Sequence, residues 1–265
     1  MTTYTHGHHE SVLRSHRWRT PENSAAYLLP LLRPTDRLLD IGAGPGTITS
    51  GLADIVQHVT ATEIGPDELD VTRRTFAERG VEKKVDLIVA DIHALPFADA
   101  SFDASHAHQV LQHVADPVLA LREMARVTAH DGIVAVRDSD YSGFAWWPRI
   151  PALDDWLDLY RSAARANGGE PEAGRRLLSW AHAAGFTSAT VGSSTWCYST
   201  SDERAWWGGM WADRIIDSGI ARQIVDTGLA TAADLQIISE AWREWVAADD
   251  GWFSVLHGEL LYRVD

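Results

Sequence analysis

The stretch LLDIGAGPGTIT, residues 38–49, restricts the fold more than any other part of the chain. Residues 37–41 predict a short buried strand, and an acid and three alternating glycines follow it directly. Glycine has no Cβ and tolerates positive φ, so a turn at residues 42–46 lets the backbone approach a ligand closely. With a helix opening at Thr47, this pattern is typical of a doubly wound sheet, in which ligands bind beside the first strand.

Strand and helix patterns alternate through the rest of the first half of the chain. Strands are predicted over 58–63, 84–91, 102–110 and 133–138, and helices over 21–32, 67–79 and 117–128. Alternation with short connections predicts a parallel sheet with helices on both faces.

The second half of the chain has a different composition. Eleven of the twelve tryptophans lie between Trp146 and Trp252. The segment AWWGGMW, residues 205–211, places large apolar side chains on nearly all sides of a helix, which must therefore be buried all round or face a pocket or partner. The predicted elements are helices over 152–165 and 171–185, two helices within 201–248, and strands over 187–199 and 252–264.

The overall charge excludes several classes of partner. The formal net charge is -14 and no basic stripe is present, so nucleic acid and anionic membrane surfaces are not expected as partners. The single cysteine, Cys197, excludes an internal disulfide and fits a reducing compartment. We find no apolar run of signal-peptide or membrane-span type and expect a soluble, cytoplasmic protein.

The acids near the glycines separate two kinds of nucleotide site. A dinucleotide site of the GxGxxG type would need glycine at position 47, where this chain has Thr47. The carboxylate of Asp40 would repel a pyrophosphate and suit an ammonium or sulfonium group, both of which S-adenosylmethionine carries. Glu63, at the end of the second strand, could accept from two ribose hydroxyls. Asp91 could accept from the adenine amino group, with Ile92 against the ring.

Four segments then carry a family resemblance. LLDIGAGPGTIT, TATEI, VADIHALPF and FDASHAHQVLQHVADPVLALREMARV together resemble class I S-adenosylmethionine-dependent methyltransferases, especially the branch similar to the ubiquinone and menaquinone C-methyltransferases. The resemblance covers residues 36–138. It implies S-adenosylmethionine as the cofactor, held by Asp40, Gly42, Ala43, Gly44, Gly46, Thr47, Glu63, Ile64, Asp91, Ile92, His108 and Gln109.

The resemblance also implies the architecture. We expect an α/β fold, Rossmann-like and doubly wound, with a mostly parallel seven-stranded sheet and a helical, Trp-rich cap inserted in the C-terminal half. Residues 1–35 would form an N-terminal lid and first helix, 36–140 the cofactor-binding core, and 141–265 the cap insertions plus the last two strands. The cap should build an aromatic-lined cavity for a small lipophilic or aromatic molecule.

Catalytic candidates follow the fourth and fifth strands. Methyl transfer from a sulfonium is an in-line displacement, so alignment supplies much of the acceleration, and a base is needed only where the acceptor proton must leave early. His108 is the best placed histidine, while His113 is more often structural. Asp138 or Tyr141 is expected to orient the acceptor, and Asp140 is a further candidate.

The N-terminal histidines allow several interpretations. HGHH, residues 6–9, has no supporting acid or cysteine cluster, so solvated side chains are favoured over a metal site, and we predict no metal. A third hypothesis is a lid over the cofactor that uses Tyr4, His8 and Arg19.

The predicted function is methyl transfer from S-adenosylmethionine to a small molecule. One alternative is an NAD(P)-dependent oxidoreductase, disfavoured by Thr47 and Asp40. Another is a cofactor-binding or interaction module without methyl transfer. Exposed apolar surface leaves a homodimer open.

Overall fold

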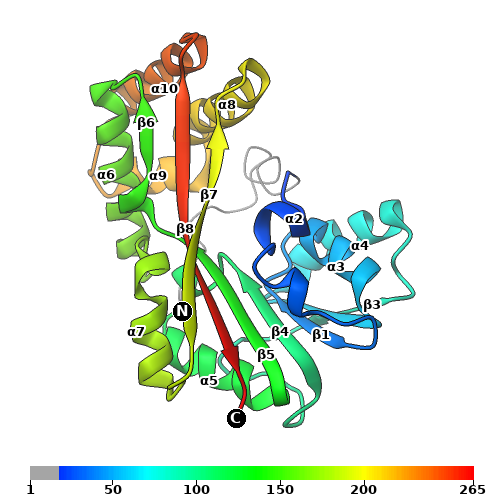
Figure 1. The fold of residues 1–265 in the computed structure, drawn as a ribbon. Coiled ribbons are helices and arrows are strands. Elements are labelled where there is room, and N and C mark those ends of the chain that lie inside the picture. The colour runs from blue at the N-terminus through cyan, green and yellow to red at the C-terminus, as the bar shows by residue number, and fades with distance from the viewer. Residues whose placement is uncertain (1–17) are drawn as a thin grey trace. The chain divides into compact units, whose positions relative to one another are not determined.

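The computed structural model describes residues 18–265, which contain one eight-stranded sheet with the order β3-β2-β1-β4-β5-β8-β6, and β7 pairs with β8 (Figure 1). The strands are β1 (Arg37–Ile41), β2 (His58–Glu63), β3 (Val85–Val89), β4 (Phe102–His108), β5 (Thr128–Ser139), β6 (Ala145–Trp147), β7 (Thr190–Tyr198) and β8 (Trp252–Arg263). Strands β3, β2, β1, β4 and β5 pair in parallel, and β6 is antiparallel to β8. The strand order reverses at β1, so the predicted doubly wound, mostly parallel α/β fold is confirmed.

The helices follow the predicted alternation. They are α2 (Pro21–Ser24), α3 (Thr47–Ile55), α4 (Pro66–Arg79), α5 (Pro117–Val127), α6 (Pro151–Ala166), α7 (Ala173–Ala184), α8 (Ser201–Asp217), α9 (Gly219–Asp226) and α10 (Ala232–Ala247). Short 3-10 turns are η1 (Leu29–Leu31), η2 (Leu111–His113) and η3 (Tyr141–Gly143).

Three local predictions were wrong. The helix expected over 21–32 ends at Ser24, because Pro30 lacks an N–H and its ring would clash with a carbonyl one turn earlier in a continuous helix. The segment 201–248 holds three helices, because Ser218 ends α8 and its hydroxyl caps α9 at the Ala221 N–H. Strand β6 was not expected, since three residues carry too short a pattern to detect.

Contacts divide the described chain into two compact units. The glycine-turn unit comprises 18–138, 173–194 and 257–265, and the tryptophan-rich unit comprises 139–172 and 195–256. Strands β7 and β8 each contribute residues to both units.

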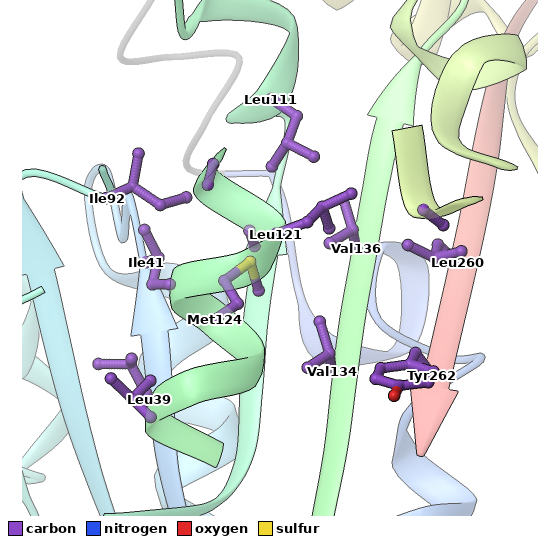
Figure 2. Packing of buried hydrophobic residues seen from close by; sticks show 14 of the residues in the cluster. Leu39, Ile41, Ile92, Leu111, Leu121, Met124, Val134, Val136, Leu260 and Tyr262 are labelled. Atoms are coloured by element: carbon purple, nitrogen blue, oxygen red, sulfur yellow. The ribbon is translucent and has the colours of Figure 1, made fainter. Parts of the chain in front are cut away.

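Alternate residues of each strand in the glycine-turn unit serve opposite faces of the sheet. Leu39 and Ile41 of β1 pack in one core cluster with Leu121 and Met124 of α5, as Figure 2 shows. Leu38 lies in a separate cluster together with residues of α3. This period of two is why both faces of the parallel sheet are covered by helices.

Aromatic rings make the core of the tryptophan-rich unit. Phe253 of β8 stacks on Trp146 of β6, with 5.6 Å between ring centroids. The ring centroid of Trp242 in α10 lies 5.4 Å from that of Phe253. Trp156 of α6 meets the faces of Trp211 and Trp242 edge-on. The AWWGGMW helix therefore buries Trp207 and Trp211 in its own unit, whereas Trp206 is partly exposed.

Candidate cofactor site

The glycine turn joins β1 to α3 and holds a conformation that side chains oppose. Gly42, Gly44 and Gly46 have φ of +68°, +58° and +80°, values that L residues with a Cβ rarely adopt. The N–H groups of Gly42 and Ala43 both donate to the carbonyl oxygen of Thr62, at 2.9 and 3.1 Å. Thr62 belongs to β2, so the turn is fixed against the neighbouring strand.

Two of these glycines also have no room for a side chain. A Cβ on Gly42 would lie 2.6 Å from Val110 Cγ2. A Cβ on Gly46 would lie 2.6 Å from Phe76 Cε1 and 2.8 Å from Thr72 Cγ2. Packing and dihedral angle therefore both require glycine.

Glu63 ends β2 and reaches the middle of the turn. The Gly44 N–H donates to its Oε1, and the Gly44 carbonyl accepts from the Thr72 hydroxyl at 2.6 Å. The structure thus places the predicted ribose acid directly beside the predicted glycine turn. Thr47 begins α3 as predicted, and Ile64, the next residue after Glu63, is 64% exposed.

Asp40 has both carboxylate oxygens engaged within the protein. Oδ2 accepts from the Thr49 hydroxyl at 2.5 Å, and Oδ1 lies 2.8 Å from His106 Nδ1. Asp40 and His106 are paired in the β1–β4 register, and both are buried. Asp40 therefore anchors the turn to α3 and β4, and its contact with a cationic ligand stays a prediction.

Asp91 and Ile92 follow β3. The Asp91 carboxylate accepts from the His93 N–H at 2.9 Å and lies 2.7 Å from His93 Nδ1, and these contacts lower its pKa. Ile92 is buried beside Ile41 in the core cluster (Figure 2).

His108 is the last residue of β4, and Gln109 follows it. Burial holds the pKa of His108 well below its usual range, and the charges of Arg19 and Arg137 lower it further. Gln109 has φ of +55°, and its Oε1 accepts from Arg19 Nη2 at 2.7 Å. Its Nε2 lies 2.9 Å from Nε2 of His257, a β8 residue that the sequence did not single out.

A buried charge lies on β5, paired in register with His108. Arg137 Nε donates to Ser194 Oγ at 3.0 Å and lies 3.4 Å from Glu259 Oε1. Burial lowers the pKa of Arg137 to about 10. Alternation places Arg137, His257 and Glu259 on the same face of the sheet. The available sequence signal was a charged residue inside an otherwise apolar strand, which requires a partner.

Asp138 points to the opposite face from Arg137. Its Oδ1 accepts from the Gln112 N–H at 3.1 Å, while Oδ2 is buried and has no hydrogen-bond partner among residues 18–265. Burial raises the pKa of Asp138 to about 7. Burial also lowers the pKa of His113 to about 4, and Gln112 Nε2 lies 3.0 Å from its Nε2.

Tyr141 belongs to the tryptophan-rich unit. Its ring stacks on Tyr160 with 4.1 Å between centroids and contacts Phe144 at 4.5 Å. Asp140 is buried, and its backbone N–H donates to the Leu256 carbonyl at 2.9 Å.

Some predictions concern residues or sites beyond these contacts. Tyr4 and His8 lie outside the described residues, and so does HGHH. Within residues 18–265, histidines, cysteines and acids form no group of three or more suited to a metal ion. No helix in that range combines the length and apolar character that crossing a membrane requires.

The geometry fits an adenosine-type cofactor. An open glycine turn offers close backbone approach, and the acids after β2 and β3 offer acceptors for hydroxyl and amino groups. Residues 39–136 match the family described as a methyltransferase domain. An uncharacterized methyltransferase of Schizosaccharomyces pombe is 32% identical over 98% of this chain and 96% of its own length. The chain belongs to the class I S-adenosylmethionine-dependent methyltransferases.

Solved structures share the fold of this methyltransferase. YcgJ from Bacillus subtilis has a TM-score of 0.59 at 23% identity, covering 92% of this chain and 99% of that one. Phosphoethanolamine N-methyltransferase 2 of Haemonchus contortus, solved with S-adenosylhomocysteine, has a TM-score of 0.55 at 17% identity, covering 88% and 50%. Membership of this family makes S-adenosylmethionine the cofactor of this methyltransferase.

Proposed function

We propose that this methyltransferase transfers a methyl group from S-adenosylmethionine to a small lipophilic or aromatic molecule. The observation that carries the proposal is the contact between the Glu63 carboxylate and the Gly44 N–H, because it puts an acceptor-only side chain at the open turn. An acceptor there suits the ribose hydroxyls of an adenosine, while the Asp40 carboxylate before the turn would oppose a diphosphate.

The cofactor-binding roles divide among the ends of four strands. Residues 42–46 supply backbone N–H and carbonyl groups, Glu63 accepts from the ribose hydroxyls, and Asp91 accepts from the adenine amino group. Ile64 and Ile92 contribute apolar contacts, and His108 and Gln109 close the site at the end of β4. The bound cofactor supplies an electrophilic methyl group on a sulfonium.

Proton transfer is assigned to two buried groups whose pKa values are shifted toward the neutral form. Burial and nearby arginines favour the neutral imidazole of His108, the form that can accept a proton. Asp138 has a pKa of about 7, near the working range of a general base. Tyr141 and Asp138 remain the proposed residues that orient the acceptor.

The substrate class rests on the composition of the tryptophan-rich unit. Its described core is made of indole and phenyl rings, and a substrate site built from the same unit would favour apolar and aromatic ligands over highly charged ones. A cytoplasmic location and a homodimer are parts of the same proposal. Size-exclusion chromatography with light scattering tests the homodimer.

Calorimetry tests the cofactor assignment. S-adenosylmethionine and S-adenosylhomocysteine should bind and NADH should not. Glu63→Gln should weaken binding of both nucleosides by roughly tenfold, since about 1.4 kcal/mol is lost with a charged hydrogen bond. Glu82→Gln, on an exposed carboxylate, is the matched control and should leave binding unchanged. NADH binding without nucleoside binding would favour the oxidoreductase instead.

The lid hypothesis needs a separate experiment. Arg19 is held by Gln109 at 2.7 Å, and we propose that Tyr4 and His8 act with it over the cofactor. Deletion of residues 1–16 should weaken S-adenosylmethionine binding, and an unchanged dissociation constant would refute the lid.

A further inference from the structure

Gln109 links a cation to a buried histidine. Its Oε1 accepts from Arg19 Nη2 at 2.7 Å, and its Nε2 lies 2.9 Å from His257 Nε2. His257 is completely buried on β8. All three residues belong to the glycine-turn unit.

The chemistry of these groups fixes the direction of each hydrogen bond. A guanidinium can only donate, so the Gln109 atom that faces Arg19 must be the carbonyl oxygen. The Gln109 amide nitrogen therefore faces His257, and it can only donate. His257 Nε2 must then accept, which requires an unprotonated Nε2 and places the proton of the neutral ring on Nδ1.

The surroundings oppose a positive charge on His257. The His108 ring lies 6.1 Å from the His257 ring at an angle of 27°. Arg19 and Arg137 both act electrostatically on His108, so two fixed cations are already nearby. Among residues 18–265, the ionisable groups that interact in this region include Arg19, Tyr27, Asp40, His106, His108, Arg137, Asp138 and Glu259.

We propose that Gln109 is a positioning residue that holds His257 as a neutral imidazole protonated on Nδ1. His257 and His108 then form a pair of uncharged rings at the end of β4. An imidazolium there would repel a sulfonium. The positively charged cofactor should therefore bind more tightly when His257 is neutral than when it is charged. This last step rests on the proposed function, whereas the tautomer of His257 does not.

Gln109→Glu is the variant that reverses the hydrogen bond. A carboxylate accepts from Arg19 as the amide oxygen does, but its second oxygen accepts where the amide nitrogen donated. His257 Nε2 must then carry a proton, either in the other neutral tautomer or in an imidazolium, which the new carboxylate also favours. The side chain keeps its size at a position whose φ is +55°, so the backbone demand is unchanged. Gln236→Glu, on an exposed residue of α10, is the matched control for the added charge.

Nitrogen NMR of histidine-labelled, ligand-free protein reads the result directly, with the His257 signals assigned by their loss in His257→Asn. The wild type and Gln236→Glu should show one protonated and one unprotonated ring nitrogen from about pH 6 to about pH 8. Gln109→Glu should show a protonated Nε2 over the same range, with Nδ1 protonated as well at the lower pH values where the ring is an imidazolium. Gln109→Met, which removes the donor, should give a mixture of tautomers. An imidazolium or the other tautomer in the wild type, or unchanged signals in Gln109→Glu, would overturn the proposal.

Cofactor affinity adds a functional readout. In Gln109→Glu, the preference for S-adenosylmethionine over S-adenosylhomocysteine should be several-fold greater at a pH above the pKa of His257 than at a pH below it. Below that pH the His257 imidazolium neutralises the new carboxylate, and above it the carboxylate is free to attract the sulfonium. The wild type should lack this pH-dependent change in preference, and observing it in the wild type would contradict the proposal. Failure of the wild type to bind either nucleoside would instead refute the proposed function and leave the tautomer result standing.

Discussion

Gly46 is required both by its positive φ and by the lack of space for a Cβ. Its φ is +80°, and an added Cβ would lie 2.6 Å from Phe76. Gly80, which caps α4, has a similar φ of +69° but nothing within 4 Å of an added Cβ. The two positions therefore separate the cost of the dihedral angle from the cost of crowding.

We expect Gly46→Ala to lose about 2–4 kcal/mol of unfolding free energy, since strain and overpacking add. Gly80→Ala should lose only about 1–2 kcal/mol, the dihedral cost alone. Urea unfolding of the two variants measures the difference. Equal losses would mean that Phe76 and Thr72 move aside without cost.

Asp138 should make stability depend on pH. Its pKa is about 7 in the folded protein and about 3.9 when unfolded. The raised folded value means that its contribution is fully present below about pH 4 and is lost as pH rises toward about 7. In Asp138→Asn no carboxyl group ionises at this position, so this loss of stability with rising pH should be absent.

The free energy of unfolding of Asp138→Asn, relative to wild type, should therefore rise between about pH 4 and about pH 7 by an amount on the order of 2–4 kcal/mol. Denaturant titrations at a series of pH values measure it. A constant difference across that range would show that Asp138 ionises normally. Full turnover in the same folded variant would remove Asp138 from the catalytic candidates.

At the scale of elements, the helix pair α8 and α10 explains the double glycine in AWWGGMW. A Cβ on Gly208 would lie 2.5 Å from Val246 Cγ2 and 2.9 Å from Trp245 Cε3, so this glycine lets the two helices approach. A Cβ on the adjacent Gly209 would meet nothing within 4 Å. Helix α8 is continuous through both glycines.

Alanine substitutions at these two adjacent glycines should change the stability of the protein in opposite directions. Gly209→Ala should stabilise the protein by about 0.5–1 kcal/mol, the difference in helix propensity. Gly208→Ala should destabilise it by about 1–3 kcal/mol through overpacking. Thermal unfolding followed by circular dichroism compares the two, and equal shifts of Tm would contradict close packing of α8 on α10.

At the scale of the whole molecule, the two units share strands. Both β7 and β8 contribute residues to each unit, so loss of either strand's order affects both. Ten of the twelve tryptophans belong to the tryptophan-rich unit, whereas the glycine turn belongs to the other. Fluorescence and ligand binding thus report mainly on different units.

Unfolding should accordingly be one cooperative transition. S-adenosylhomocysteine at about 100 times its dissociation constant should stabilise the folded protein by about 2.7 kcal/mol. The tryptophan fluorescence transition should shift together with the loss of ligand binding, as measured by thermal melts with both probes. A fluorescence transition whose midpoint temperature does not change when the ligand is added would show that the units unfold independently.

The sequence by itself determined the strand–turn–helix at residues 37–55 and the acids after β2 and β3. These features depend on local conformation and on the period of two within each strand, which a chain displays residue by residue. The tertiary structure alone decided that His106 meets Asp40 and that Gln109 meets His257. Such contacts depend on register between strands distant in sequence, and no local pattern encodes which buried polar groups will satisfy one another.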